Sequence, residues 1–120
     1  MNRRPLRVLG VLGAGALLAG ATILPASAQV VFQGQELKAS DYSCGSNERI
    51  FDKGPTIKGI PLYQHAMVYR HCGTGSVKRK ADVIADTDGK CVTIQAGKAV
   101  VIHQEYAFLS RTVYRSSKSC

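Results

Sequence analysis

The chain has 120 residues, which is the length of one domain, and it carries 16 Lys and Arg residues against 8 Asp and Glu residues. The resulting formal net charge of +8 is spread along the sequence. It falls short of the clustered charge of a dedicated nucleic-acid binder, and we therefore expect no nucleic-acid partner.

Residues 1–28 have the pattern of a secretory signal peptide. A basic start precedes an apolar, Gly- and Ala-rich run, and residues 26–28 form a small-residue cleavage site. The run is short for a bilayer and diluted by glycines, so we favour cleavage after Ala28 over a retained anchor. Cleavage removes 28 of 120 residues, three of them basic, and leaves 92 residues with 13 basic and 8 acidic side chains, a charge of +5. We predict a secreted, extracellular, monomeric protein with no membrane partner after cleavage.

The mature part contains four cysteines, Cys44, Cys72, Cys91 and Cys120. An even number in a small exported domain predicts two disulfides, although spacing alone leaves three connectivities open. Structural metal sites use close pairs such as C-x-x-C, whereas these cysteines are 28, 19 and 29 residues apart. We therefore expect neither a metal-thiolate site nor a catalytic thiol.

Residues 29–40 are largely polar and show no clear periodicity, which indicates a loose N-terminal arm. A position along a sheet edge is open to this arm. The single domain then occupies residues 41–120. Its first part, residues 44–64, is interrupted by three glycines and two prolines. This pattern predicts only short strands joined by turns, and the most loop-like stretch of the mature chain.

From residue 66 onward, short strand-like segments alternate with Gly-containing breaks. They occupy residues 66–72, 76–86, 90–95, 98–104 and 109–114. Such spacing, without a helical stripe, predicts an all-β antiparallel sandwich or small barrel. Residues 86–89 suit a type I turn with Gly89 in the left-handed conformation, and residues 95–98 supply the next reversal.

Alternation assigns faces within the last strands. Val92 and Ile94 share one face of their strand, with Cys91 on the other. Along the next strand, Val100 and Ile102 are expected to face opposite to Val101 and His103. Cys91 then needs either a bulge after Gly89 or a bridge near the rim of the sandwich.

The candidate catalytic side chains are few. His65, His71 and His103 form no HxxxH or HExxH pair, so we expect no metal and no cofactor. His103, Glu105 and Arg111 have the residue types of the acid, base and phosphate-binding trio of a small secreted ribonuclease. The same residues on exposed strands also describe a solvated face.

Two further groups of side chains suggest binding. Residues 78–80 form a basic run, Lys-Arg-Lys. On a strand, Lys78 and Lys80 share one face and Arg79 points to the other. This arrangement favours an edge strand protected by lysines over a polymer-binding patch. The five tyrosines are either interface anchors or core. They are Tyr42, Tyr63, Tyr69, Tyr106 and Tyr114.

Residues 71–120 resemble the secreted bacterial α-amylase inhibitors of the tendamistat type. The shared framework begins with a cysteine after a strand and a charged strand that leads to an Asp-rich turn, with Gly89 just before Cys91. It continues with an Ala-x-Gly-like turn and ends with a final cysteine. Glu105-Tyr106 stands where the family has Gly-Tyr. The resemblance implies a six-stranded antiparallel β-sandwich with the bridges Cys44–Cys72 and Cys91–Cys120.

The resemblance also implies a binding function. The family's inhibitory Trp-Arg-Tyr triplet lies in a hairpin turn ahead of the second cysteine, often directly after Tyr-Gln. Tyr63-Gln64 matches the Tyr-Gln pair, but the triplet does not follow it and the chain has no tryptophan. We expect an enzyme inhibitor of the α-amylase inhibitor type, itself not an enzyme, whose partner is an extracellular enzyme such as a glycoside hydrolase. The expected target-binding residues are Tyr63, Gln64, His65, Tyr69 and Arg70. The alternatives are a small ribonuclease-like hydrolase using His103, Glu105 and Arg111, and a polymer-binding module using residues 78–80.

Overall fold

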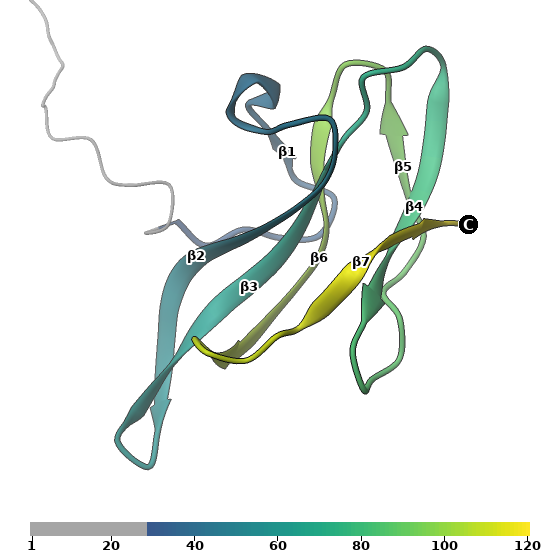
Figure 1. The fold of residues 1–120 in the computed structure, drawn as a ribbon. Coiled ribbons are helices and arrows are strands. Elements are labelled where there is room, and N and C mark those ends of the chain that lie inside the picture. Colours follow the sequence, from purple (N-terminus) through teal and green to yellow (C-terminus); the bar gives the residue numbers. More distant parts are fainter. Residues whose placement is uncertain (1–28) are drawn as a thin grey trace, which may run out of the picture.

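The computed structural model describes residues 29–120, and the predicted signal peptide lies outside the described residues. Within residues 29–120, seven strands form two antiparallel sheets that pack as a sandwich (Figure 1). The larger sheet has the order β1 (Glu36–Leu37), β6 (Ala99–Phe108), β3 (Ile60–Arg70), β2 (Gly45–Ile57). The smaller has the order β5 (Val92–Gln95), β4 (Ser76–Val83), β7 (Tyr114–Ser119). The predicted all-β sandwich is confirmed, with the two-residue β1 as a seventh strand; a 3₁₀ turn, η3 (Ala39–Asp41), follows β1.

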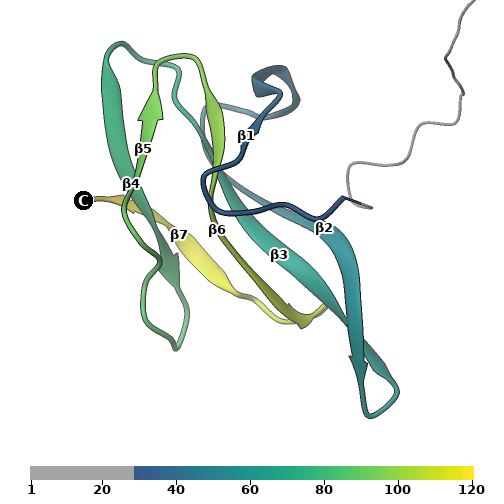
Figure 2. The ribbon, with the colours of Figure 1, turned by 180° about the vertical axis from the view of Figure 1, so that it is seen from behind.

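The expectation of a loop-like stretch over residues 44–64 is wrong. The structure forms the two longest strands there, β2 and β3, as one hairpin that projects from the sandwich (Figures 1 and 2). Pro55 is tolerated because β2 is an edge strand whose register shifts twice, between Ile50 and Lys53 and between Lys53 and Thr56. Gly54 does not interrupt the strand; it leaves room for the ring of Tyr106, which a Cβ at this position would overlap.

The hairpin reverses over two residues, Lys58 and Gly59. Both have positive φ values, 50° and 80°, which match the right-handed twist of the flanking strands in a type I′ turn. The turn leaves Ile57 and Ile60 paired at the end of the hairpin.

Both faces of the larger sheet are covered. Between the sheets lies one core of mainly aliphatic side chains, which includes Met67, Ile94, Ile102 and Tyr114. The opposite face carries a second core, in which residues of the N-terminal arm and β2, such as Val31 and Phe51, cover Ala66, Val68 and Val101. A central strand such as β3 is therefore buried on both sides.

The segment 29–40, expected as a loose arm, is held against this second face. The side-chain amide of Gln64 accepts a hydrogen bond from the Val31 amide at 3.0 Å and donates one to the Val31 carbonyl at 2.7 Å. β1 pairs with the edge of β6, and the Val101 amide donates to the Gln35 carbonyl at 2.9 Å.

A bulge in β6 overturns one predicted face. Met67 lies opposite His103, whereas Val68 lies opposite Val101, so β6 has one extra residue between these pairs. His103 is therefore placed on the inter-sheet face with Val100 and Ile102, and not on the face of Val101. The alternation predicted for β5 is confirmed, because Ile94 is buried, Val92 is partly buried, and their neighbours are exposed.

The turns differ in one detail. The reversal at residues 95–98 is confirmed, with the Lys98 amide donating to the Gln95 carbonyl at 3.2 Å. In the loop before β5, however, the positive φ belongs to Ala85 and not to Gly89, so the left-handed assignment of Gly89 is wrong. Gly89 is required for space instead, because a Cβ there would lie 2.9 Å from Cδ2 of His103.

Two disulfides, Cys44–Cys72 and Cys91–Cys120, close the ends of the strands. The first joins the start of β2 to the chain just after β3, and the second joins the start of β5 to the end of β7. This is the pairing that the family resemblance implies. Cys91 is exposed and lies just before β5, so it needs no bulge to turn it inward.

Candidate target-binding site

The projecting end of the β2–β3 hairpin exposes apolar side chains. Ile57 is 47% exposed and Ile60 is 54% exposed, and the adjoining Phe108 and Leu109 at the end of β6 are exposed as well. These residues flank an apolar pocket of about 460 Å³, which is lined by Ile60, Pro61, Tyr63, Phe108, Leu109 and Ser110. Isolated exposed apolar residues are ordinary, whereas a contiguous group marks a contact surface.

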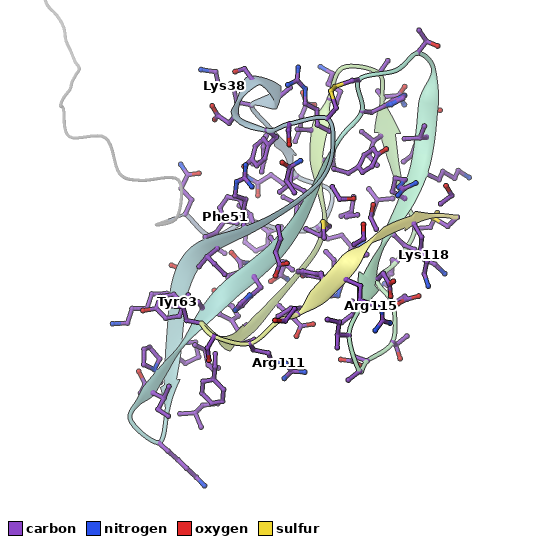
Figure 3. The ribbon with its side chains drawn as sticks, in the orientation of Figure 1. Lys38, Phe51, Tyr63, Arg111, Arg115 and Lys118 are labelled. Atoms are coloured by element: carbon purple, nitrogen blue, oxygen red, sulfur yellow. A yellow bond between two sulfur atoms is a disulfide. The ribbon has the colours of Figure 1, made fainter. Side chains whose placement is uncertain are left out.

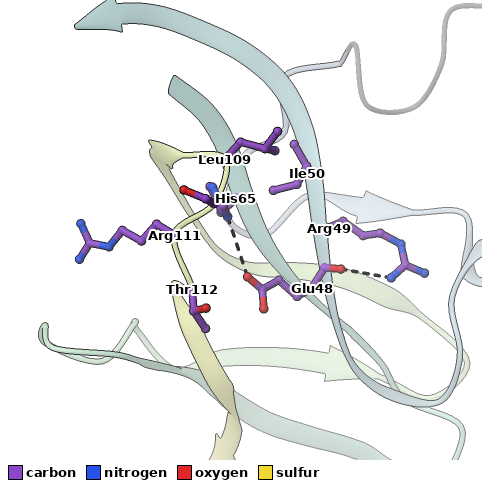
Figure 4. A pocket seen from close by; sticks show the side chains of 8 residues that line it. Glu48, Arg49, Ile50, His65, Leu109, Arg111 and Thr112 are labelled. Carbon is purple, nitrogen blue, oxygen red and sulfur yellow. Dashed lines mark hydrogen bonds and ion pairs between the residues drawn. The ribbon is translucent and has the colours of Figure 1, made fainter. Parts of the chain in front are cut away.

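A second pocket of about 460 Å³ adjoins the first, and because its lining is the more polar of the two we call it the polar pocket (Figure 4). The two pockets share Leu109 and Ser110 in the loop between β6 and β7. Its charged and titratable side chains are Glu48 and Arg49 from β2, His65 from β3 and Arg111 from that loop. No sequence signal marks Glu48, because its approach to His65 depends on the pairing of β2 with β3.

His65 is the buried wall of the polar pocket, with 1% of its surface exposed. Its Nε2 donates to the Phe108 carbonyl at 3.0 Å, and its Nδ1 lies 3.9 Å from Oε2 of Glu48. The Tyr114 hydroxyl donates to the His65 carbonyl at 3.2 Å. Strands β6 and β7 thus hold both the ring and the backbone of this histidine.

Tyr114 connects His65 to His103. Its hydroxyl donates to the His65 carbonyl and accepts from Nδ1 of His103 at 2.8 Å. Burial raises the pKa of the Tyr114 hydroxyl well above its ordinary value, and the carboxylates of Glu105 and Glu48 add to that rise. Burial lowers the pKa of His103, while Glu105 and Asp86 act in the opposite direction. At neutral pH, these shifts keep the tyrosine protonated and favour a neutral His103.

The structure divides the predicted target-binding residues. Tyr63 is half-buried and lines the apolar pocket on the projecting hairpin (Figure 3), and His65 lines the polar one. Gln64 is only 1% exposed and points to the opposite face of the sheet, where it binds Val31. Gln64 therefore holds the N-terminal arm, and it is not among the residues that line either pocket.

Tyr69 and Arg70 lie at the other end of β3, away from the hairpin tip. The Arg79 guanidinium stacks on the Tyr69 ring, 4.8 Å from its centroid. Arg70 donates to the Tyr42 carbonyl at 2.7 Å. Both predicted residues therefore contribute to internal contacts near the first disulfide.

The ribonuclease-like trio is not assembled. His103 and Glu105 lie on β6, whereas Arg111 lines the polar pocket beside His65. His103 is half-buried and bonded to Tyr114. Among residues 29–120, no hydrogen bond or ion pair joins any two of the three.

The basic run lies on β4 with its middle residue turned inward. Arg79 donates two hydrogen bonds to the Ser117 hydroxyl and one to the Ser117 carbonyl, which leaves Lys78 and Lys80 on the outer face. On the neighbouring β7, Lys118 is paired with Asp88 at 2.6 Å and Arg115 with Asp82 at 3.0 Å (Figure 3). The outer face of this sheet therefore mixes both signs of charge, which disfavours polyanion binding.

Two further findings concern the described part of the chain. Within residues 29–120, no group of three or more His, Cys, Asp or Glu side chains is arranged to hold a metal ion. The same residues include no helix of the length and apolarity that crossing a bilayer requires.

Comparison of the chain with protein-family models, with curated proteins and with solved structures gives no match in any of the three.

Proposed function

We propose that this protein is exported and acts by binding, as an inhibitor of an extracellular glycoside hydrolase such as α-amylase. The observation that carries the proposal is the projecting β2–β3 hairpin, whose end exposes Ile57 and Ile60 beside the pocket formed by Tyr63 and Phe108. A convex, apolar edge suits the concave cleft of such an enzyme. The two disulfides support export, because they form and persist in oxidising compartments.

Rigidity favours this mode of action. The Cys44–Cys72 bridge closes the base of the hairpin, and the type I′ turn fixes its tip. A contact surface that is already ordered loses less conformational entropy on docking, so more of the contact energy appears as affinity.

We place the proposed contact surface at the end of the hairpin. Tyr63 remains its aromatic anchor, and Ile57, Ile60, Phe108 and Leu109 extend it. Aromatic and large apolar side chains supply most of the energy at protein interfaces, through burial in a partner's pocket. The absent Trp-Arg-Tyr triplet implies that the energetic centre differs from that of the α-amylase inhibitor family.

Inhibition kinetics with a panel of α-amylases, other glycoside hydrolases and proteases test the proposal. The mature protein should inhibit at least one glycoside hydrolase, and Tyr63→Ala should weaken that inhibition by about 1–3 kcal/mol while the fold persists. Absence of inhibition across the panel would refute the proposal. Unfolding of Tyr63→Ala would instead show that Tyr63 serves the core.

A further inference from the structure

The three histidines differ in how their ring nitrogens are used. The Nε2 of His71 donates to backbone carbonyls of the turn after β3, and its Nδ1 accepts from the Gly73 amide. The Nδ1 of His103 bonds to Tyr114. In His65, by contrast, Nε2 is used, whereas Nδ1 is buried and has no hydrogen-bond partner among the described residues.

The contact of Nε2 fixes what Nδ1 can do. The Phe108 carbonyl can only accept, so Nε2 of His65 carries the proton, and Nδ1 of the neutral ring presents a lone pair. Oε2 of Glu48 lies 3.9 Å from Nδ1, which is too far for a hydrogen bond, and it is itself an acceptor. Two acceptors, one of them negatively charged, therefore face each other across the wall of the polar pocket (Figure 4).

A group that satisfies both atoms must donate twice from a small volume. For a nitrogen about 2.9 Å from each atom, the angle at the nitrogen between the two acceptors would be about 85°. Two N–H bonds of an ammonium group can point toward acceptors at this angle. A hydroxyl has a single proton and would satisfy only one of them, whereas a water molecule can donate to both but carries no charge to pair with the carboxylate. A positive charge is also favoured by the Glu48 carboxylate.

The arginines that line this pocket do not fill that position. The Arg49 guanidinium stacks on the ring of Tyr42, 5.1 Å from its centroid, and donates to a backbone carbonyl. Arg111 extends away from His65 (Figure 4). Ile50 and Leu109 supply apolar wall beside the acceptor pair, which suits the aliphatic stem of a lysine.

We propose that the Glu48–His65 pocket binds a primary ammonium group, namely the side chain of a lysine on the docked enzyme. The identification of the ligand as a lysine of the target enzyme rests on the proposed function. The binding of an ammonium group by the pocket can be tested without a target. The apolar hairpin end then supplies buried area, and the pocket selects partners that carry a lysine beside that area.

The test is an NMR titration of the mature protein with Nα-acetyl-lysine amide, with Nα-acetyl-norleucine amide as the neutral probe. The lysine probe should shift the His65 ring and Glu48 resonances saturably, with millimolar affinity, and the neutral probe should not. Glu48→Gln keeps the shape of a partly exposed side chain and removes its charge, so it should weaken binding about tenfold or more. Glu36→Gln is the matched control, because Glu36 pairs with Lys98 on β1 and should leave binding unchanged.

The outcomes separate the two proposals. Equal shifts from both probes, no shift up to about 50 mM probe, or undiminished binding by Glu48→Gln would overturn the pocket assignment. Shifts at His65 with maltose or zinc ions but not with the lysine probe would overturn it as well. Lysine binding without inhibition of any enzyme would refute the inhibitor proposal and leave the pocket standing.

Discussion

Single residues in this molecule show how closely the two sheets approach. Gly89, in the loop before β5, lies against His103 of β6, and a Cβ would come within 2.9 Å of Cδ2 and 3.4 Å of the His103 Cβ. The His103 ring is held by Tyr114 at an edge-on angle of 84°. The ring therefore has little freedom to move aside.

We expect Gly89→Ala to lower the free energy of unfolding by about 1–3 kcal/mol, through overpacking and not through backbone strain. Urea denaturation of Gly89→Ala, His103→Ala and the double variant would measure the coupling between the two sites. The loss caused by Gly89→Ala should shrink when His103 is already alanine. An equal loss in both backgrounds would contradict this explanation of the glycine.

His103 also predicts a pH dependence of stability. Burial lowers its pKa in the folded chain below the ordinary value of 6.5, so the unfolded chain takes up the proton at a higher pH. Its contribution is complete above about pH 6.5 and is lost as the pH falls through that value toward the folded pKa. Between about pH 7.5 and pH 5, the urea midpoint should therefore fall more in the wild type than in His103→Gln. Parallel midpoints for the two proteins would contradict the assignment.

At the scale of elements, β3 shows why the pattern of polar and apolar residues does not predict which of its side chains are exposed. Its two faces carry Tyr63, His65 and Met67 on one side and Gln64, Ala66 and Val68 on the other. Both faces are covered, the first by the smaller sheet and the second by the N-terminal arm. Polar side chains are therefore buried on both faces of β3. The alternation rule assumes that one face of a strand is exposed to solvent, so it does not predict this burial.

The side chain of Gln64 holds the arm in place. Gln64→Ala removes both hydrogen bonds to Val31 and one to Gln104, and leaves buried backbone groups without partners. We expect a loss of about 1–3 kcal/mol and faster hydrogen exchange at the Val31 and Val101 amides. Gln95→Ala, at an exposed position of β5, is the control and should leave exchange unchanged. Unaltered protection of Val31 in Gln64→Ala would show that apolar packing alone retains the arm.

The interpretation of residues 44–64 failed for a different physical reason. Glycine and proline usually interrupt strands, but an edge strand with bulges accommodates Pro55, and Gly54 leaves room for the ring of Tyr106. The position of Lys58-Gly59 as the turn, and hence of Ile57 and Ile60 at the tip, depends on the register of two long strands. Likewise, no sequence signal marks the β6 bulge that turns His103 inward.

At the scale of the whole molecule, the sequence predicted the fold class well because disulfides and β alternation are strong local signals. The alternation in residues 91–95 and the even cysteine count required no knowledge of tertiary contacts. The candidate site, in contrast, combines β2, β3 and the loop after β6. Only Tyr63 and His65 of the expected contact residues lie there, since the others face away or lie at the far end of β3.

The two disulfides should stabilise the chain similarly but affect binding differently. They close loops of 28 and 29 residues, so replacing either pair by serine should lower stability by about 3–4 kcal/mol. Cys44→Ser/Cys72→Ser should also weaken target binding, because it loosens the base of the projecting hairpin. Cys91→Ser/Cys120→Ser should preserve the affinity of the molecules that remain folded. Thermal unfolding and affinity measured below both transitions would check this, and equal affinity of the two variants would count against the role of the hairpin.

The central claim is that the end of the β2–β3 hairpin contacts an extracellular enzyme. The most direct measurement is the affinity of an inhibited enzyme for Ile57→Ser/Ile60→Ser, compared with Val30→Ser/Phe32→Ser. The control pair is similarly exposed, at 44% and 64%, but lies on the N-terminal arm. The hairpin variant should bind at least about tenfold more weakly and fold normally, while the arm variant should bind like the wild type. Equal affinity of the two variants, or stronger loss in the arm variant, would contradict the account.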